Sequence, residues 1–474
     1  MSQRKTLTHM TVTNQRRTLA LVLLLSLLLT QFATPVAAQS ATQDFSALET
    51  IIKEELQATK TPGAAISIVQ GVRVIYSKGF GVSNVETGAP VTTDMLFRLG
   101  STTKMFTAAA LVTLSSQGKL RLDEPVGTYL GSVNPKLARI TTHQLLSNSG
   151  GVADFAPAFI SQDDEALSRM IRGWKEDALF TEPGQVYSYS SPGYWLAGHV
   201  IEETFKKPYA DAMTELVFAP AGMTATTLRP LQAMTYPLSM GHSVGPEGKP
   251  VVLRPAYNNV AQWPAGSIYS NVRELSRFVI ALMNNGRVEG KQALSPEVPT
   301  KLFGKYVQMP GDADVYYGYG LLNFEDRGVR VIMHGGFSRG YGSMIQMVPA
   351  ERFAVIVQTN RSGETLPRTR MKAMELFLKL KAEAQPEAKR ARALSEADLS
   401  NFAGRYTNGP QTWEIAARQG KLFYKGAEGE VELQKTARNR LSFGEKLEND
   451  FMFVANARGE SLYIFDGLYS ARKQ

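Results

Sequence analysis

The chain has 474 residues, more than a single hydrophobic core usually organises, so we expect one large domain and one smaller one. With 43% hydrophobic and 20% charged residues, its composition is typical of a globular protein and excludes a disordered chain, a collagen-like repeat and a multi-spanning membrane protein. The formal net charge is +9, but no basic cluster is interleaved with aromatic residues, so nucleic acid is not an expected partner.

The N-terminus has the features of an export signal. Two adjacent arginines precede an apolar run over residues 19–29, and small residues follow at 36–38. A membrane anchor is the alternative, but the run is too short to span a bilayer comfortably. We therefore expect a signal peptide over residues 1–38, cleaved after Ala38, and a periplasmic or secreted protein without a stable membrane anchor. The paired arginines leave both the general and the twin-arginine export routes open.

The next elements in chain order are a helix, a hairpin and a second helix. Apolar residues at helical spacing predict an amphipathic helix over 44–60, and Val- and Ile-rich runs at 64–70 and 72–81 flank Gly71 as in a hairpin. The segment 101–117 is apolar almost all round, which predicts a helix buried inside the domain.

A long helical and loop-rich section follows, before strands return near residue 329. We expect helices at 194–205, 209–218 and 273–283, strands at 329–333, 344–348 and 353–358, and a closing helix at 368–381. The closely spaced strands are typical of an antiparallel meander.

The C-terminal part is expected to form a separate unit. Residues 381–394 are charged and alanine-rich, with little to pack, and predict a linker. Residues 395–474 alternate short strand-like segments with turns, which predicts a small all-β domain. The larger domain then covers 44–380.

A serine and a lysine three residues apart open the buried helix. A serine hydroxyl needs a base within hydrogen-bond reach, and Lys104 would share a helix face with Ser101, whose backbone N–H is a free donor of the first turn. Burial would lower the pKa of Lys104 toward that of a working base. Ser116 and Lys119 repeat the spacing, but at the C-terminal end of the helix, where carbonyl groups would oppose an oxyanion.

Two further segments could complete such a site. Tyr189 follows a Pro-Gly turn and precedes a helix, so a nearby cation could stabilise its phenolate; Tyr257 is a competing tyrosine in a less favourable setting. The third segment is a His-Gly-Gly-Phe run at the end of a strand, where glycines admit substrate and a following N–H can donate to an oxyanion. Its residues are His334, Gly335, Gly336 and Phe337.

In this order and on these elements, the three motifs resemble the serine hydrolase group of class C β-lactamases, D-alanyl-D-alanine carboxypeptidases and family VIII esterases. The resemblance covers most of residues 44–380. It implies an α+β fold of the β-lactamase and penicillin-binding-protein type, with an antiparallel sheet flanked by helices, a helical lobe and the site between them.

The resemblance also implies roles for the motif residues. Ser101 becomes the acylated nucleophile, Lys104 and Tyr189 share acid–base work, and the N–H groups of Ser101 and Phe337 form the oxyanion hole. His334 takes the place of a motif lysine and would contact the substrate or Tyr189. The appended β domain resembles modules found in some members of this group.

Two departures from the family pattern affect the expected substrate. Ser191 stands where the family often has an asparagine that holds an acylamido side chain, and His334 replaces a cationic lysine that would hold a carboxylate. Both favour ester or D-amino-acid peptide hydrolysis, through an acyl-enzyme, over β-lactamase activity. A β-lactamase proper and a non-catalytic protein that binds cell-envelope peptides remain the alternatives.

No cofactor or metal is expected. The histidines lack ligand spacing, and no His-Glu-x-x-His motif or phosphate-binding loop is present. The expected partners are a small-molecule ester or peptide and, in the cell envelope, cell-wall peptides.

Overall fold

The computed structural model describes residues 44–311, 314–383, 388–426 and 429–474. The predicted signal peptide lies outside these ranges, as does the middle of the predicted linker. None of the helices within the described ranges is both long enough and apolar enough to cross a membrane.

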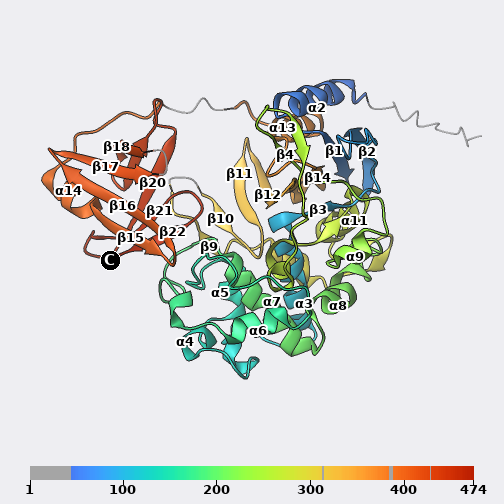
Figure 1. Ribbon diagram of the computed structural model, residues 1–474, viewed down its shortest axis with the longest axis horizontal. Coiled ribbons are helices and arrows are strands. Elements are labelled where there is room, and N and C mark those ends of the chain that lie inside the picture. The colour runs from blue at the N-terminus through green and yellow to red at the C-terminus, as the bar shows by residue number, and fades with distance from the viewer. Residues whose placement is uncertain (1–43, 312–313, 384–387, 427–428) are drawn as a thin grey trace, which may run out of the picture. The chain divides into compact units, whose positions relative to one another are not determined.

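An antiparallel eight-stranded sheet organises the larger part of the chain (Figure 1), in the order β2-β1-β14-β13-β12-β11-β10-β9. The predicted hairpin and meander are confirmed, since β2 pairs with β1, and β12, β13 and β14 are consecutive neighbours. The first strand of this sheet in chain order, β1, therefore lies beside the last, β14, and pairs with it. The strands are β1 Gly63–Gln70, β2 Arg73–Gly81, β9 Val307–Gln308, β10 Tyr316–Tyr317, β11 Leu322–Asp326, β12 Val329–Ser338, β13 Tyr341–Val348 and β14 Phe353–Thr359.

Helices cover both faces of this sheet. The Ser67 hydroxyl on β1 is hydrogen-bonded to Ser276 of α11 (Val272–Met283), which places α11 on one face. The Gln346 amide on β13 contacts Met374 of α13 (Pro367–Phe377). Gln346 is in register with Ile68, so both side chains lie on the face opposite to that of Ser67, and α13 covers this second face. Because strand residues alternate between faces, the central strands are buried on both.

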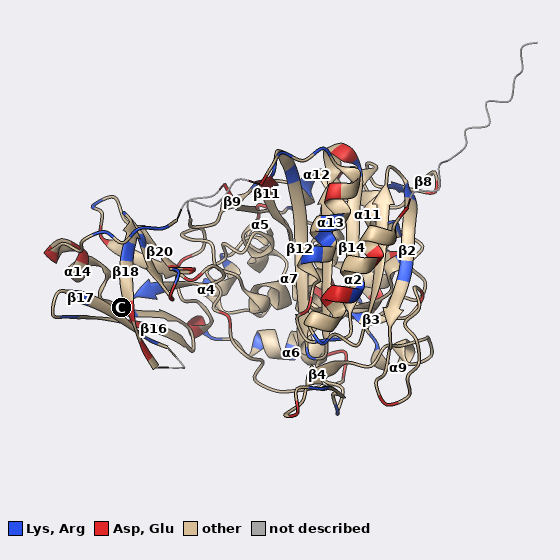
Figure 2. Ribbon diagram, turned by 90° about the horizontal axis from the view of Figure 1, so that it is seen from above, with Lys and Arg blue, Asp and Glu red and all other residues tan. Residues whose placement is uncertain are grey.

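The outer pair of helices presents its charged residues to solvent. Figure 2 shows basic residues on α13 beside acidic residues on α2 (Ser46–Ala58). Arg368 forms an ion pair with Glu54 at 3.0 Å, while the buried Glu55 carboxylate accepts hydrogen bonds from the first backbone N–H groups of α13. Glu55 thus caps α13 across the helix pair.

The helical lobe is built around α3 (Thr103–Ser116) and α7 (Ser191–Phe205), which contact each other. Every residue of α3 from Thr103 to Leu114 is buried, as the apolar pattern predicted. The other elements of this section are α4 Pro135–Ala138, α5 Thr142–Leu146, α6 Ala166–Arg172, α8 Tyr209–Met213, α9 Pro230–Ala233, α10 Trp263–Gly266, α12 Glu297–Leu302, and the short strand pairs β3 Phe97–Arg98 with β6 Tyr269–Ser270, β4 His242–Val244 with β5 Pro250–Val252, and β7 Arg287–Val288 with β8 Lys291–Gln292.

The C-terminal strands close into an eight-stranded antiparallel barrel, so the expected small β domain is confirmed. A short helix, α14 (Glu396–Phe402), precedes it. The segment before α14 is attached to the barrel, because Lys389 forms an ion pair with Asp450 at 2.7 Å. The strands are β15 Gly404–Asn408, β16 Gln411–Arg418, β17 Lys421–Gly426, β18 Gly429–Ala437, β19 Arg440–Phe443, β20 Asn449–Ala455, β21 Ser461–Phe465 and β22 Ser470–Lys473.

Candidate active site

Ser101 lies in a tight turn that two glycines hold against the sheet. It belongs to a 3-10 turn, Gly100–Thr102, that leads into α3, whereas the sequence predicted the first residue of the α-helix itself. Gly100 has a φ of +54°, and a β-carbon there would lie 2.3 Å from the carbonyl oxygen of Phe337. A β-carbon at Gly336 would lie 1.8 Å from the Leu99 carbonyl oxygen. Only glycines permit this approach, which brings β12 to the nucleophile.

The candidate nucleophile and the candidate base are in contact. The Nζ atom of Lys104 lies 3.3 Å from Ser101 Oγ and 3.4 Å from Ser191 Oγ, and it donates to the Ala265 carbonyl at 3.0 Å. The Lys104 side chain is fully buried, although the described ion pairs include none to it. One amine therefore faces two hydroxyl groups and one carbonyl in an environment that disfavours charge.

Burial lowers the pKa of Lys104 from its usual 10.5 to about 7, and the carboxylate of Asp154 opposes this by favouring the ammonium form. A substantial fraction of the amine is then neutral at physiological pH. A neutral amine beside a serine hydroxyl can accept its proton, which is the requirement for a general base.

Tyr189 also reaches the site, but as a neutral phenol. Its ring lies over Lys104, with Nζ 4.6 Å from the ring centroid. Burial raises the pKa of its hydroxyl well above the usual value, and hydrogen bonds to Ser101 and Ser191 only partly oppose this. The expected phenolate is therefore disfavoured in the resting site, because loss of solvation outweighs these hydrogen bonds. A buried phenol in this position can donate a proton.

Ser191 begins α7 and faces the same amine. Its backbone N–H donates to Asp154 Oδ1 at 2.9 Å, while Ser190 caps the helix by accepting from the Gly193 N–H. The segment that carries Tyr189 and Ser191 is thus fixed by a helix N-terminus and by one buried carboxylate.

His334 lines the site but its ring nitrogens are engaged elsewhere. Nδ1 donates to the Gly335 carbonyl at 2.6 Å, so Nε2 accepts from the Tyr317 hydroxyl at 2.9 Å. Burial lowers the pKa of His334 to about 3, so the ring is uncharged at neutral pH. Its ring centroid is 6.3 Å from that of Tyr189. The structure therefore gives His334 no hydrogen bond to Tyr189 and no charge with which to hold a carboxylate.

The glycine-rich end of β12 completes the cavity wall. Strand β11 pairs with β12 only as far as Met333, so residues 334–338 pair with β13 alone and extend past β11. His334, Gly335, Gly336 and Phe337 line the same cavity as Ser101, and the Phe337 ring is 68% exposed at its rim.

This cavity measures about 620 Å³ and includes residues that the sequence did not identify. Besides the predicted residues it is lined by Tyr187, Met309, Tyr317, Leu322, Gly363, Thr365, Gly467, Leu468 and Tyr469. The sequence analysis also missed Asp154. The only sequence feature that could have identified it is that it is an acidic residue in a mostly apolar loop. The last three lining residues belong to the barrel, and no local motif marks them.

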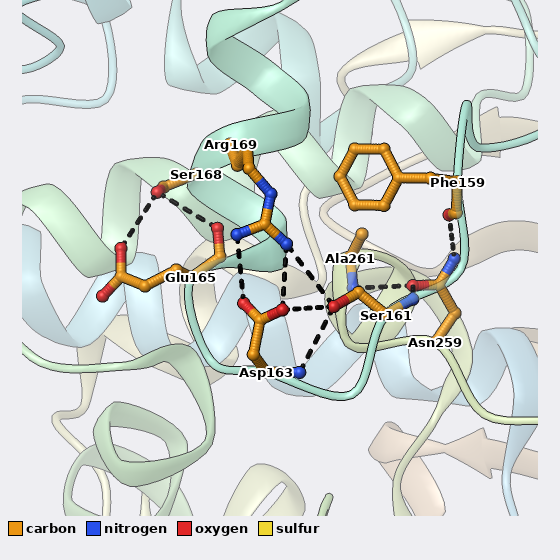
Figure 3. A network of polar contacts seen from close by, with 8 residues as sticks. All are labelled: Phe159, Ser161, Asp163, Glu165, Ser168, Arg169, Asn259 and Ala261. Atoms are coloured by element: carbon orange, nitrogen blue, oxygen red, sulfur yellow. Dashed lines mark hydrogen bonds and ion pairs between the residues drawn. The ribbon is translucent and has the colours of Figure 1, made fainter.

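The loops at residues 155–180 and 225–265 do not line this cavity. Figure 3 shows that they are instead tied to each other. The Asn259 side chain accepts from the Ser161 N–H at 3.2 Å and donates to the Phe159 carbonyl at 2.9 Å, while Asp163 pairs with Arg169 at 2.9 Å. Their polar side chains fix loop conformation and do not contact the candidate nucleophile.

The competing residues have other partners. The Tyr257 hydroxyl donates to Gln262, away from the serine. His143, His199 and His242 are hydrogen-bonded to Tyr319, Glu202 and the Asn360 carbonyl respectively, and His9 lies outside the described residues. In the described ranges no group of three or more potential metal ligands occurs.

The helix-flanked antiparallel sheet, the helical lobe and a serine in contact with a buried lysine fit the serine hydrolase group of β-lactamases and penicillin-binding proteins. The family model described as Beta-lactamase matches residues 48–377, and the chain belongs to this family, whose members are serine hydrolases.

Relatives support this membership. The chain is 26% identical over 328 residues to Penicillin-binding protein 4 of Amycolatopsis lactamdurans, covering 65% of this chain and 84% of that protein. It is 24% identical over 332 residues to Protein flp of Staphylococcus aureus (strain COL), covering 68% of this chain and 64% of that relative's length, which is less than two thirds. Its fold is similar to the octameric penicillin-binding protein homologue from Pyrococcus abyssi, with a TM-score of 0.65, 24% identity, and coverage of 91% of this chain and 100% of that one.

Proposed function

We propose that this protein is an exported serine hydrolase that cleaves esters or D-amino-acid peptides through an acyl-enzyme on Ser101. The observation that carries the proposal is the buried Lys104 amine, 3.3 Å from the Ser101 hydroxyl, with its pKa lowered to about 7. An amine of that pKa is matched to proton transfer at physiological pH.

In the proposed reaction, neutral Lys104 accepts the Ser101 proton as Oγ attacks the substrate carbonyl carbon. The carbonyl oxygen becomes an oxyanion, for which the backbone N–H groups of Ser101 and Phe337 are the proposed donors. The Tyr189 phenol gives its proton to the leaving group and regains one from the Lys104 ammonium. The tetrahedral intermediate collapses to the acyl-enzyme, and water then attacks it by the reverse sequence of proton transfers.

The cavity lining supports a substrate without a carboxylate near the scissile bond. None of the described lining residues is a lysine or arginine, and His334 is uncharged at neutral pH. Ser191 does not offer the amide that would hold an acylamido side chain. We therefore rank uncharged esters above D-Ala-terminated peptides, and both above β-lactams.

Export and location are part of the same proposal. A cleaved signal peptide over residues 1–38 would deliver the enzyme to the periplasm or the medium, where cell-wall peptides are available partners.

A substrate panel tests the proposal. Wild type and Ser101→Ala would be compared on short-chain p-nitrophenyl esters, a chromogenic cephalosporin and D-Ala-terminated peptides, with a fluorophosphonate probe to label the nucleophile. We expect ester turnover and labelling that Ser101→Ala abolishes. Preference for the cephalosporin would favour a β-lactamase, and peptide binding without turnover, unchanged in Ser101→Ala, would indicate a non-catalytic binding protein.

A further inference from the structure

The turn between β21 and β22 of the barrel belongs to the candidate substrate cavity. Gly467, Leu468 and Tyr469, three consecutive residues of this turn, line it together with Ser101. We propose that Leu468 is a specificity-determining residue that limits the size of an uncharged, apolar acyl chain bound beside Ser101. The inference rests on the proposed function and deepens it by naming what bounds the substrate.

Backbone contacts attach this turn directly to the segment that carries the candidate proton donor. The Tyr189 N–H donates to the Leu468 carbonyl at 3.1 Å, and the Ser470 N–H donates to the Ser188 hydroxyl at 3.1 Å. The Ser470 hydroxyl donates to the Tyr187 carbonyl, and the Tyr469 ring packs edge-on against Tyr189 with centroids 6.3 Å apart. The turn and the segment 187–189 therefore hold each other in place.

Buried side chains reinforce this attachment. Asn408 on β15 donates to both the Ser188 hydroxyl and the Ser470 carbonyl, and its amide oxygen accepts from the Asp154 N–H at 3.2 Å. These groups are shielded from water, so their hydrogen bonds are costly to break. Phe465 of the barrel also packs against Tyr187, in an apolar cluster that includes Tyr317.

A ligand in the cavity can contact the rim of the barrel but not its interior, which is filled by side chains. A closed eight-stranded barrel is just wide enough for side chains to fill or for one small ligand. Here apolar side chains pack together as its core: Phe402, Tyr406, Trp413, Ile415, Leu422, Leu433, Leu441, Phe451, Phe453, Ile464 and Ala471. The contribution of the barrel to binding is then the turn that reaches the cavity.

The chemistry of the cavity identifies the group that Leu468 would bound. Leu468 is 41% exposed and Phe337 is 68% exposed, although both are large apolar side chains that line the cavity. Covering them with a ligand removes apolar surface from water, which favours an apolar group. No lysine or arginine among the described lining residues offers a charge partner. An aliphatic acyl chain fits this lining.

The chain has no cysteine, which permits a test with single introduced thiols. Leu468→Cys is compared with Leu462→Cys, because Leu462 on β21 is equally exposed, at 39%, yet does not line the cavity. Each variant is treated with N-ethylmaleimide, and kcat/KM is then measured for p-nitrophenyl hexanoate. We expect modification to lower kcat/KM by about tenfold or more in Leu468→Cys and to leave Leu462→Cys unchanged.

Protection of the thiol provides a second measurement that does not need turnover. In a Ser101→Ala background, ethyl hexanoate at ten times its dissociation constant should slow modification of Leu468→Cys about tenfold, without effect on Leu462→Cys. If wild type and Ser101→Ala hydrolyse esters equally slowly, the proposed function fails, and protection alone decides this inference. Unchanged turnover after modification, or equal modification rates with and without the ester, would overturn it.

Discussion

The two ends of α3 carry the same serine-x-x-lysine spacing in different surroundings. At the N-terminal end, Lys104 is buried and its amine contacts the Ser101 hydroxyl. At the other end, the Ser116 hydroxyl donates to the Thr113 carbonyl at 2.8 Å, and the exposed Lys119 lies over the Phe205 ring, 4.7 Å from its centroid. The serine-x-x-lysine spacing alone therefore does not create a nucleophile; burial of the amine and the polarity of the helix end are also needed.

The largest expected difference between the two ends is in the nucleophile. Ser101→Ala should reduce ester turnover by on the order of 10⁴-fold or more, because the acyl-enzyme can no longer form. Ser116→Ala should stay within about twofold of wild type, since its hydroxyl only bonds its own helix. Steady-state p-nitrophenyl acetate hydrolysis measures both. Equal losses in the two variants would remove the distinction.

The next largest difference is expected between substitutions of the two lysines, Lys104 and Lys119, in their effect on kcat. Lys104→Met keeps the buried volume but removes the base, so kcat should fall by roughly 10²–10⁴-fold. Lys119→Met, at an exposed position just beyond the C-terminal end of α3, should leave kcat within about twofold of wild type. A Lys104→Met enzyme with near-normal kcat would exclude the amine as the base.

The Lys104→Met variant should also be more stable than the wild type. Because the native pKa of Lys104 is about 7 against an ordinary 10.5, the unfolded chain holds a proton between these values that the native protein lacks. Burial of Lys104 therefore destabilises the native state fully below pH 7, and this destabilisation decreases as the pH rises toward 10.5. Lys104→Met should raise the free energy of unfolding by about 1–2 kcal/mol at pH 7, and the gain should shrink near pH 10. Thermal melts across this range measure it; a pH-independent difference would contradict it.

The pH profile should distinguish Asp154 from other carboxylates. Turnover should rise through pH 7 as Lys104 loses its proton. The Asp154 charge favours the ammonium form, so Asp154→Asn should lower the pKa of Lys104. The ascending limb of the pH–rate profile should then move to lower pH by about one unit. Asp163→Asn, which alters an exposed ion pair in the loop of Figure 3, should not move it. A limb that stays in place in Asp154→Asn would show that another group titrates.

The smallest effect is expected at Ser191. Ser191→Ala removes a hydroxyl 3.4 Å from Lys104 Nζ while keeping the backbone N–H that donates to Asp154. Loss of one such hydrogen bond corresponds to about fivefold in kcat. A loss as large as that of Lys104→Met would instead place Ser191 in the proton transfer itself.

Local sequence patterns were enough to predict most helices and strands and to identify the candidate residues. Local periodicity predicted the hairpin, the buried helix and the meander, because side-chain patterns follow helix and strand geometry directly. It also separated Ser101 from Ser116, because the polarity of a helix end depends only on position along the helix.

The charge of the site and the segments that enclose it could be known only from the folded structure. The neutral states of Tyr189 and His334 follow from burial by distant segments, which no local pattern records. Asp154 lies 50 residues from Lys104 and Leu468 lies 279 residues from Tyr189 along the chain, and each reaches the site only through tertiary contacts, such as that of the Tyr189 N–H with the Leu468 carbonyl. Solvation and long-range contacts are properties of the folded arrangement, so the protonation states and the distant lining residues could not be predicted from local sequence patterns.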